Sequence, residues 1–112
     1  MNIHGIEVKG KVIDAFTRCE HYDTEKDIIA IKFPCCRTFY PCYECHEACA
    51  DHRAERWPSG SDSEKAVLCG SCGHRLTIAE YQGCGYVCPH CLAAFNPRCG
   101  RHAHLYFEVH NP

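Results

Sequence analysis

The sequence predicts a small α+β fold that zinc stabilises, in which an irregular two-zinc module is followed by a β-rich zinc ribbon. Three observations lead to this prediction. The chain of 112 residues includes 12 Cys and 9 His, many of them spaced like metal ligands. Leu, Ile, Val and Phe together make up less than a fifth of the residues. A polar stretch rich in turn-forming residues, 56–64, separates the chain into two halves.

So few large apolar side chains give a thin core, and small domains with thin cores depend on disulfides or metal ions. The sequence begins Met-Asn-Ile-His-Gly, without the basic start and apolar segment of an export signal. We therefore expect an intracellular protein whose Cys and His bind metal, with a disulfide framework as the alternative. No apolar run is long enough to cross a membrane, so no membrane association is expected.

Two short strands and one helix are expected in the first half. Residues 6–12 alternate apolar and polar side chains, and residues 27–33 are rich in β-branched and aromatic side chains, as strands are. Between them, Cys19 and His21 are two residues apart and would face the same side of an extended segment. Residues 42–52 have a composition that a short helix tolerates.

The second half is expected to follow a connecting loop at residues 58–64. Residues 65–68 are strand-like and lead directly into a Cys pair. Thr77 and Glu80 have the spacing of a capping box, which predicts a one-turn helix after Thr77. Residues 104–109 are predicted to add a closing strand.

These elements predict a single zinc finger domain over residues 1–112, built in two parts. The two-zinc module spans residues 10–57, and the zinc ribbon with its closing strand spans residues 65–112. Because the loop between them has few side chains to bury, the two parts are expected to be separable to a degree.

The ribbon contains the clearest metal-binding motif. Two Cys-x-x-Cys pairs, Cys69 with Cys72 and Cys88 with Cys91, are separated by fifteen residues. Two residues between thiolates allow a tight turn that aims both sulfurs at one ion, and two such turns complete a tetrahedral site of four sulfurs. The alternative is that one pair is redox-active, but such a pair normally opens a helix in an α/β domain, whose repeating pattern is absent from this sequence.

The first module contains eight further candidate ligands, which are enough for two closed four-coordinate sites. They are Cys19, His21, Cys35, Cys36, Cys42, Cys45, His46 and His52. Together with the ribbon, these residues predict three bound zinc ions.

The pattern of these ligands resembles the CHY zinc finger family. The similarity extends from about Gly10 to Phe107 and is strongest to the small stand-alone members in residues 27–33, 95–99 and 104–107. The resemblance implies that the ribbon belongs to the same domain and that zinc is bound tightly. Larger members append a second zinc domain and a RING domain that make them ubiquitin ligases, and no such activity is expected for this chain.

Spacing alone indicates less clearly which of the eight ligands share an ion. Cys35 and Cys36, like Cys45 and His46, are adjacent residues whose side chains diverge in regular structure, so interleaved sites are expected. Cys19 and His21 have the spacing of residues that share a face of an extended segment, and Cys42 and Cys45 have the Cys-x-x-Cys spacing of a metal-binding turn. These two spacings favour one grouping. It places Cys19, His21, Cys42 and Cys45 on one ion, and Cys35, Cys36, His46 and His52 on the other.

Charge and coordination limit the function. The 12 Lys and Arg are scattered among 14 Asp and Glu, and the formal net charge of −2 argues against nucleic-acid binding. Zinc catalysis needs an open coordination position, whereas every predicted site has four protein ligands, so no enzyme activity is expected. We expect a structural zinc protein that acts as an interaction module for an unidentified protein partner.

The alternative function is a zinc-handling or thiol-redox helper that exchanges zinc with a client protein. The resemblance implies this alternative, because a fungal family member is described as keeping the thiol-oxidation machinery of the mitochondrial intermembrane space free of zinc. The expected location is the cytoplasm, with the mitochondrial intermembrane space as the alternative for a eukaryotic host.

Several Cys and His have no place in the three predicted sites. Cys49 and Cys84 are either small buried residues or thiols that take part in metal transfer. Cys99, His102 and His104 form a cluster that could hold a further ion, but it offers only three ligands.

Overall fold

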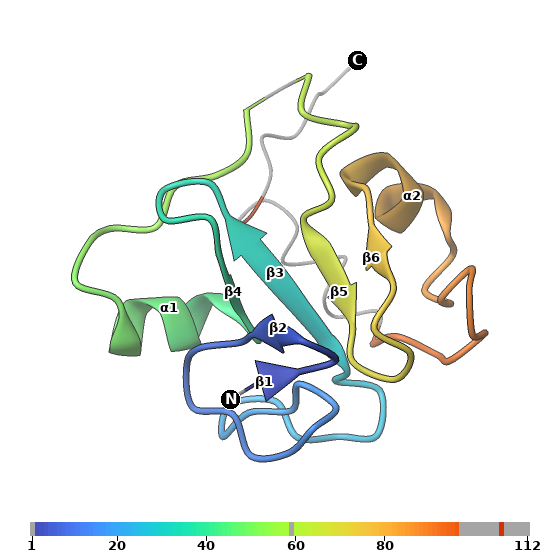
Figure 1. Ribbon diagram of the computed structural model, residues 1–112, viewed down its shortest axis with the longest axis horizontal. Helices are drawn as coiled ribbons and strands as arrows, with labels where there is room; N and C mark the ends of the chain where they lie inside the picture. The colour runs from blue at the N-terminus through green and yellow to red at the C-terminus, as the bar shows by residue number, and fades with distance from the viewer. Residues whose placement is uncertain (1, 59, 97–105, 107–112) are drawn as a thin grey trace.

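A four-stranded antiparallel sheet organises the protein. The structure is a computed structural model that describes residues 2–58, 60–96 and 106. Its sheet has the order β4-β3-β5-β6, and a separate hairpin pairs β1 with β2 (Figure 1). The strands are β1 (Asn2–Ile3), β2 (Ile6–Glu7), β3 (Ile29–Phe33), β4 (Thr38–Tyr40), β5 (Val67–Cys69) and β6 (Arg75–Leu76).

The central pair of strands joins the two halves of the chain. Ile31 of β3 lies opposite Val67 of β5, and Ala30 lies opposite Leu68. The stretch at residues 58–64 therefore separates, along the chain, two segments that pair in one sheet. The expected partial separation of the two halves finds no support in this arrangement, because each half supplies two strands to the same sheet.

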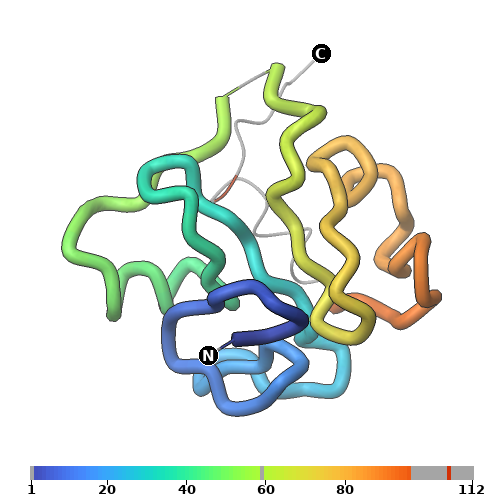
Figure 2. The backbone as a smooth tube through the Cα atoms, in the orientation of Figure 1, coloured from blue at the N-terminus to red at the C-terminus, as the bar shows by residue number. Residues whose placement is uncertain are grey.

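Each face of the sheet packs against a different cluster of apolar side chains. Ile31 and Phe33 of β3 point into the larger cluster, which also contains the single Trp of the chain, Trp57. Ala30 and Leu68 point to the opposite face, where the hairpin residue Ile3 covers them. Figures 1 and 2 show the hairpin across one end of the sheet, which leaves the other end of this face uncovered by β1 and β2.

Both expected helices are present. Helix α1 (Tyr43–Cys49) begins after Cys42, whose sulfur accepts a hydrogen bond from the backbone N–H of Cys45. Helix α2 (Ile78–Gly83) begins after Thr77 with the predicted capping box, in which the side chains of Thr77 and Glu80 each accept a backbone N–H of the other residue. Helix α1 lies beside β4 and α2 beside β6 (Figure 1). Neither is long enough to cross a bilayer, and the described residues contain no other helix.

The strand predicted for residues 6–12 is much shorter in the structure. Regular pairing stops at Glu7, after which Val8 forms only a bridge to Phe39 of β4. Gly10 then adopts φ +112°, and a Cβ on it would lie 2.7 Å from the Cβ of Cys45. The chain bends here because it passes directly over Cys45, which only glycine permits.

Strands β1, β4 and β6 were not predicted from the sequence. The closing strand predicted for residues 104–109 lies outside the described residues except for Tyr106. That side chain is buried, and its hydroxyl accepts a hydrogen bond from the backbone N–H of Tyr43. Its backbone carbonyl accepts a second one from Trp57. Tyr106 therefore ties the second half of the chain to the first.

Candidate metal centres

The first metal centre joins two distant segments of the first half. Cys19 and His21 lie in the loop before β3, whereas Cys42 and Cys45 lie at the start of α1. The sulfurs of Cys19 and Cys42 are 3.7 Å apart. Nδ1 of His21 lies 3.4 Å from the sulfurs of both Cys42 and Cys45. The three Cys are buried, and the exposed His21 closes the site from the solvent side.

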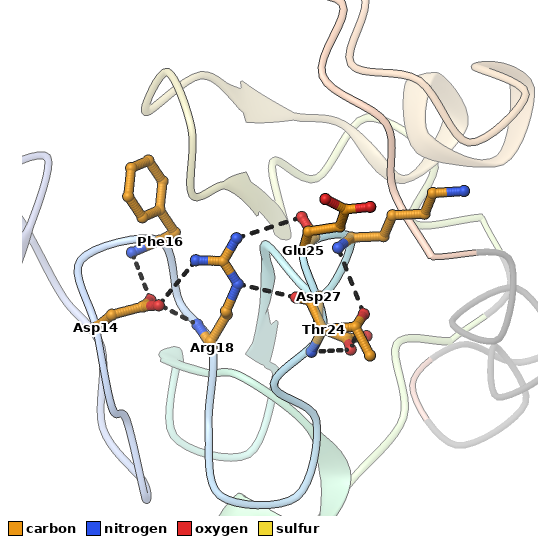
Figure 3. Close-up of polar contacts among 7 residues, drawn as sticks. Asp14, Phe16, Arg18, Thr24, Glu25 and Asp27 are labelled. Atoms are coloured by element: carbon orange, nitrogen blue, oxygen red, sulfur yellow. Dashed lines mark hydrogen bonds and ion pairs between the residues drawn. The ribbon is translucent and has the colours of Figure 1, made fainter.

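Arg18 holds the loop that carries Cys19 and His21. Its guanidinium donates hydrogen bonds to the Asp14 carboxylate at 2.8 Å and to the backbone carbonyl of Thr24 at 2.8 Å (Figure 3). Asp14 in turn accepts a hydrogen bond from the backbone N–H of Arg18. These contacts close the loop on both sides of the two ligands, so the loop has a defined shape despite its lack of secondary structure.

A buried pair ties the same loop to the ribbon. The side-chain amide of Asn96 donates to the carboxylate of Asp27 at 2.9 Å, and the other oxygen of Asp27 accepts the backbone N–H of Thr24 (Figure 3 shows the latter contact). Gly70, next to a ribbon ligand, donates its N–H to the carbonyl of Ile28. The first and third centres are thus connected through the start of β3.

The second metal centre lies at the turn between β3 and β4. Cys35 and Cys36 come from this turn, His46 from α1, and His52 from the segment after α1. The sulfur of Cys35 lies 3.4 Å from Nε2 of His46, and the two sulfurs are 4.0 Å apart. Nε2 of His46 lies 3.2 Å from Nε2 of His52.

This second centre is the most open of the three. Only His46 is buried, both Cys are partly exposed, and His52 is exposed. Nδ1 of His52 is hydrogen-bonded to the Asp51 carboxylate at 2.9 Å, and the Asp51 side chain is fully exposed. Nδ1 of His46 is buried and has no hydrogen-bond partner among the described residues. A metal-bound His normally donates its second ring N–H to an acceptor, which orients the ring and strengthens the metal bond. His46 lacks such an acceptor among the described residues.

The third metal centre is the ribbon site. Cys69 ends β5 and Cys72 follows in the turn to β6, whereas Cys88 and Cys91 lie after α2. The sulfurs of Cys69 and Cys91 are 3.8 Å apart, as are those of Cys72 and Cys88. Cys69 and Cys88 are buried, and the other two are partly buried.

The spacing of the donor atoms fits zinc at all three centres. With Zn–S bonds of about 2.3 Å and Zn–N bonds of about 2.0–2.1 Å, a tetrahedron has S–S edges of about 3.8 Å, S–N edges of about 3.5–3.6 Å and N–N edges of about 3.3–3.4 Å. The observed separations lie close to these values, and within each group of four all donor atoms are within 4.8 Å of one another. The described residues therefore form three closed zinc sites. The first offers three sulfurs and one imidazole, the second two sulfurs and two imidazoles, and the third four sulfurs.

Electrostatics show why the converging sulfurs require a cation. Hydrogen bonds from Cys42 and Cys45 lower the pKa of the Cys19 thiol to about 2, whereas its own hydrogen bond to Cys19 raises the pKa of Cys42. One thiolate is thus stabilised by neighbouring thiols that must keep their protons. Zinc replaces those protons and stabilises all three thiolates at once. At the second centre, burial and the neighbouring His52 lower the pKa of His46, which keeps it neutral as a zinc ligand must be.

The structure brings together the same three groups of four residues that the sequence analysis grouped. Cys49 is exposed, and Cys84 is partly buried with its thiol donating to the carbonyl of Tyr81. Neither belongs to a ligand group that the described residues form, and Cys99, His102 and His104 lie outside those residues. Sequence reasoning overlooked the supporting residues Asp51 and Arg18. The one signal that could have found them is that each directly precedes a predicted ligand.

Comparisons with known proteins agree with this geometry. A family model described as CHY zinc finger matches residues 19–81, which include the ligands of the first two centres and one Cys pair of the third. The chain is 41% identical to Helper of Tim protein 13 of Saccharomyces cerevisiae, over 90% of each chain. It is 38% identical to Helper of Tim protein 13 of Kluyveromyces lactis, over 90% of this chain and 88% of the relative. An uncharacterised protein of Schizosaccharomyces pombe shows the same identity and coverage.

Proposed function

The chain belongs to the CHY zinc finger family, and we propose that it is a zinc-built interaction module that assists another protein by binding it directly. Zinc forms the scaffold in this proposal, and the surface around the scaffold makes the contact. The proposal includes the absence of enzyme activity.

The closed coordination of the three centres supports this function most directly. Each centre has four protein donors, so none offers the open position that a catalytic zinc ion uses for water or substrate. The three centres also lie at the points where the sheet meets its loops and helices. A metal in such a place fixes the fold, and the exposed loops are free to recognise a partner.

The names of the relatives suggest the partner. Two of them are called helpers of Tim proteins, and the chain covers 90% and 88% of their lengths. We propose that the client is a Tim protein. With that client, the mitochondrial intermembrane space becomes the preferred location over the cytoplasm.

Isothermal titration of the zinc-loaded chain with a Tim protein from the same host tests this function. We expect a saturable complex of defined stoichiometry that is lost after zinc is removed from the chain. The titration should be made with the Tim protein both reduced and oxidised, because any cysteines it has can bind zinc in the reduced form only. Absence of binding in both states would contradict the proposal.

A second function, zinc exchange with the client, is favoured by the second centre alone. His52 and its partner Asp51 are exposed, and Cys36 is partly exposed, so a competing thiolate has access to the ion. The buried Nδ1 of His46 has no described acceptor to strengthen that ligand. In the first centre, by contrast, three buried Cys accompany the exposed His21, and the third centre has four Cys and no His.

Cadmium substitution tests zinc exchange site by site. The three centres have three, two and four sulfurs, so ¹¹³Cd bound at each should give a separate resonance whose position follows the sulfur count. On addition of a mild chelator, we expect the resonance of the second centre, which has two sulfurs, to disappear first while the other two persist. Loss of all three resonances at equal rates would contradict a dedicated exchange site.

A further inference from the structure

One face of the sheet carries a group of basic side chains that the zinc centres do not use. These side chains surround a groove with a volume of about 360 Å³. Four cationic residues line it, and they come from positions far apart in the sequence. They are Lys9, Lys32, Arg37 and Arg75.

The strand register explains why these residues meet. Lys32 follows Ala30 by two positions on β3, so both side chains lie on the same face. Ala30 lies opposite Leu68, and Leu68 lies opposite Arg75 of β6, so Arg75 shares that face as well. Ala30 and Leu68 are buried, whereas Lys32 is partly exposed and Arg75 is exposed. Ile6 and Glu7 of the hairpin line the groove beside these cations. The groove is therefore a fixed part of the sheet.

Trp57 holds two of the four cations in place. The Lys32 ammonium lies 5.7 Å from the centre of the Trp57 ring, and the Arg37 guanidinium lies 6.0 Å from it. The ring itself is fixed, because its N–H donates to the carbonyl of Lys32 at 2.6 Å and the side chain is buried. Two like charges on one aromatic ring repel each other, which a bound anion would relieve.

The chain supplies little negative charge to this groove. Glu7 also lines it, but the ion pairs among the described residues are Arg18 with Asp14 and two His–carboxylate pairs elsewhere. None of the four groove cations thus forms an ion pair within the described part of the chain. A third of the 12 Lys and Arg are gathered at this one place in a protein whose net charge is −2.

We propose that this groove binds an acidic segment of the protein partner, with carboxylates of Asp or Glu side chains between Lys32, Arg37 and Arg75. The inference rests on the proposed interaction function and names the chemistry of the partner surface. Arg37 directly follows Cys36, a ligand of the second centre, so a segment held here lies next to the most open zinc site. A buried aromatic wall, Phe39, gives the groove one apolar side that suits a peptide better than a free phosphate.

A labelled hexaglutamate peptide tests the groove. Fluorescence anisotropy of a fluorescein-labelled hexaglutamate is measured against the zinc-loaded chain, and we expect saturable binding that weakens as salt is raised. In a ¹⁵N spectrum, the peptide should shift the resonances of residues around Lys9, Lys32, Arg37 and Arg75. Shifts elsewhere, or no binding at low salt, would overturn the inference.

Charge reversal separates this groove from general electrostatic attraction. The double variant Arg37→Glu/Arg75→Glu should bind the peptide at least about tenfold more weakly, and Arg75→Glu alone, which leaves the Trp57 contacts intact, should also weaken it. Lys26→Glu/Arg53→Glu changes the net charge equally at positions outside the groove and should bind more tightly than the first variant does. Zinc content and circular dichroism confirm that each variant is folded. Equal loss in both double variants would overturn the inference.

Two further comparisons distinguish the partner classes. A single-stranded oligothymidylate of the same charge that binds more tightly than hexaglutamate would overturn the acidic-peptide assignment in favour of a nucleic acid. Titration of a Tim protein against Arg37→Glu/Arg75→Glu separates the two proposals. Weaker binding supports the groove, whereas unchanged binding overturns it and leaves the proposed function standing.

Discussion

Ile31 of β3 lies directly opposite Val67 of β5, although the polar stretch at 58–64 separates them in the sequence. The pairing places the ribbon ligand Cys69 in the same sheet as the strand that leads to Cys35. Loss of one zinc centre should therefore affect the packing of both halves. The shared core cluster, which contains residues of both halves, strengthens this coupling.

Cys72→Ser should destabilise the whole domain and not only the ribbon. A structural zinc site contributes on the order of 10 kcal/mol, which is comparable with the entire stability of a small domain. We expect the melting temperature to fall by more than about 10 °C. Trp57 fluorescence and far-ultraviolet circular dichroism should report the same transition, because Trp57 lies in the shared core.

Cys84→Ser is the matched control for that variant, since Cys84 is a Cys of the second half that belongs to none of the ligand groups found among the described residues. Its melting temperature should stay within a few degrees of the parent protein. A Trp57 transition that is unchanged in Cys72→Ser would show that the first half is stable without the ribbon.

Zinc removal should unfold the protein. The described core relies on ligand residues themselves, since Cys19, Cys42, Cys45, Cys69 and Cys88 are all part of its main apolar cluster. Without zinc, the converging sulfurs must take up protons or repel one another. Circular dichroism after dialysis against a strong chelator should show loss of the sheet and helices.

The control for zinc removal is the same chelator saturated with zinc beforehand, which should leave the spectrum unchanged. Metal analysis must show that the treated sample is free of zinc. A native spectrum in such a sample would contradict the dependence of folding on metal.

Asp51→Ala should weaken zinc binding at the second centre. Asp51 accepts a hydrogen bond from Nδ1 of His52, and the loss of such a partner lowers metal affinity, here by about tenfold because Asp51 is fully exposed. Competition with a chromogenic chelator measures the effect. Asp62→Ala, which removes a carboxylate outside the metal centres, should bind zinc with the affinity of the parent protein. Equal zinc affinity in both variants would show that Asp51 does not support the site.

The ligand groups could be predicted from the sequence because their chemistry is local. The pairs Cys69 with Cys72 and Cys88 with Cys91 are recognisable by spacing, and Cys19 and His21 share a face of an extended loop. The helix after Thr77 was predictable for the same reason, since a capping box needs only two residues three positions apart.

The remaining features depend on contacts between distant residues, which no local pattern encodes. Strands β4 and β6 contain three and two residues, too few to show an alternation of apolar and polar side chains. The basic groove looked like scattered charge in the sequence, because the register of three strands is needed to bring Lys32 and Arg75 to one face.

Alkylation of the native protein should distinguish bound from free cysteines. Zinc holds nine sulfurs as bound thiolates, which lowers their reactivity, whereas Cys49 is exposed and belongs to none of the three described centres. Cys84 is partly buried and donates its thiol hydrogen to the carbonyl of Tyr81, so it should react more slowly than Cys49. Peptide mass mapping over time measures both rates. Rapid modification of Cys69 or Cys88 in zinc-loaded protein would contradict the ribbon site, because both residues are buried and are expected to be bound to zinc.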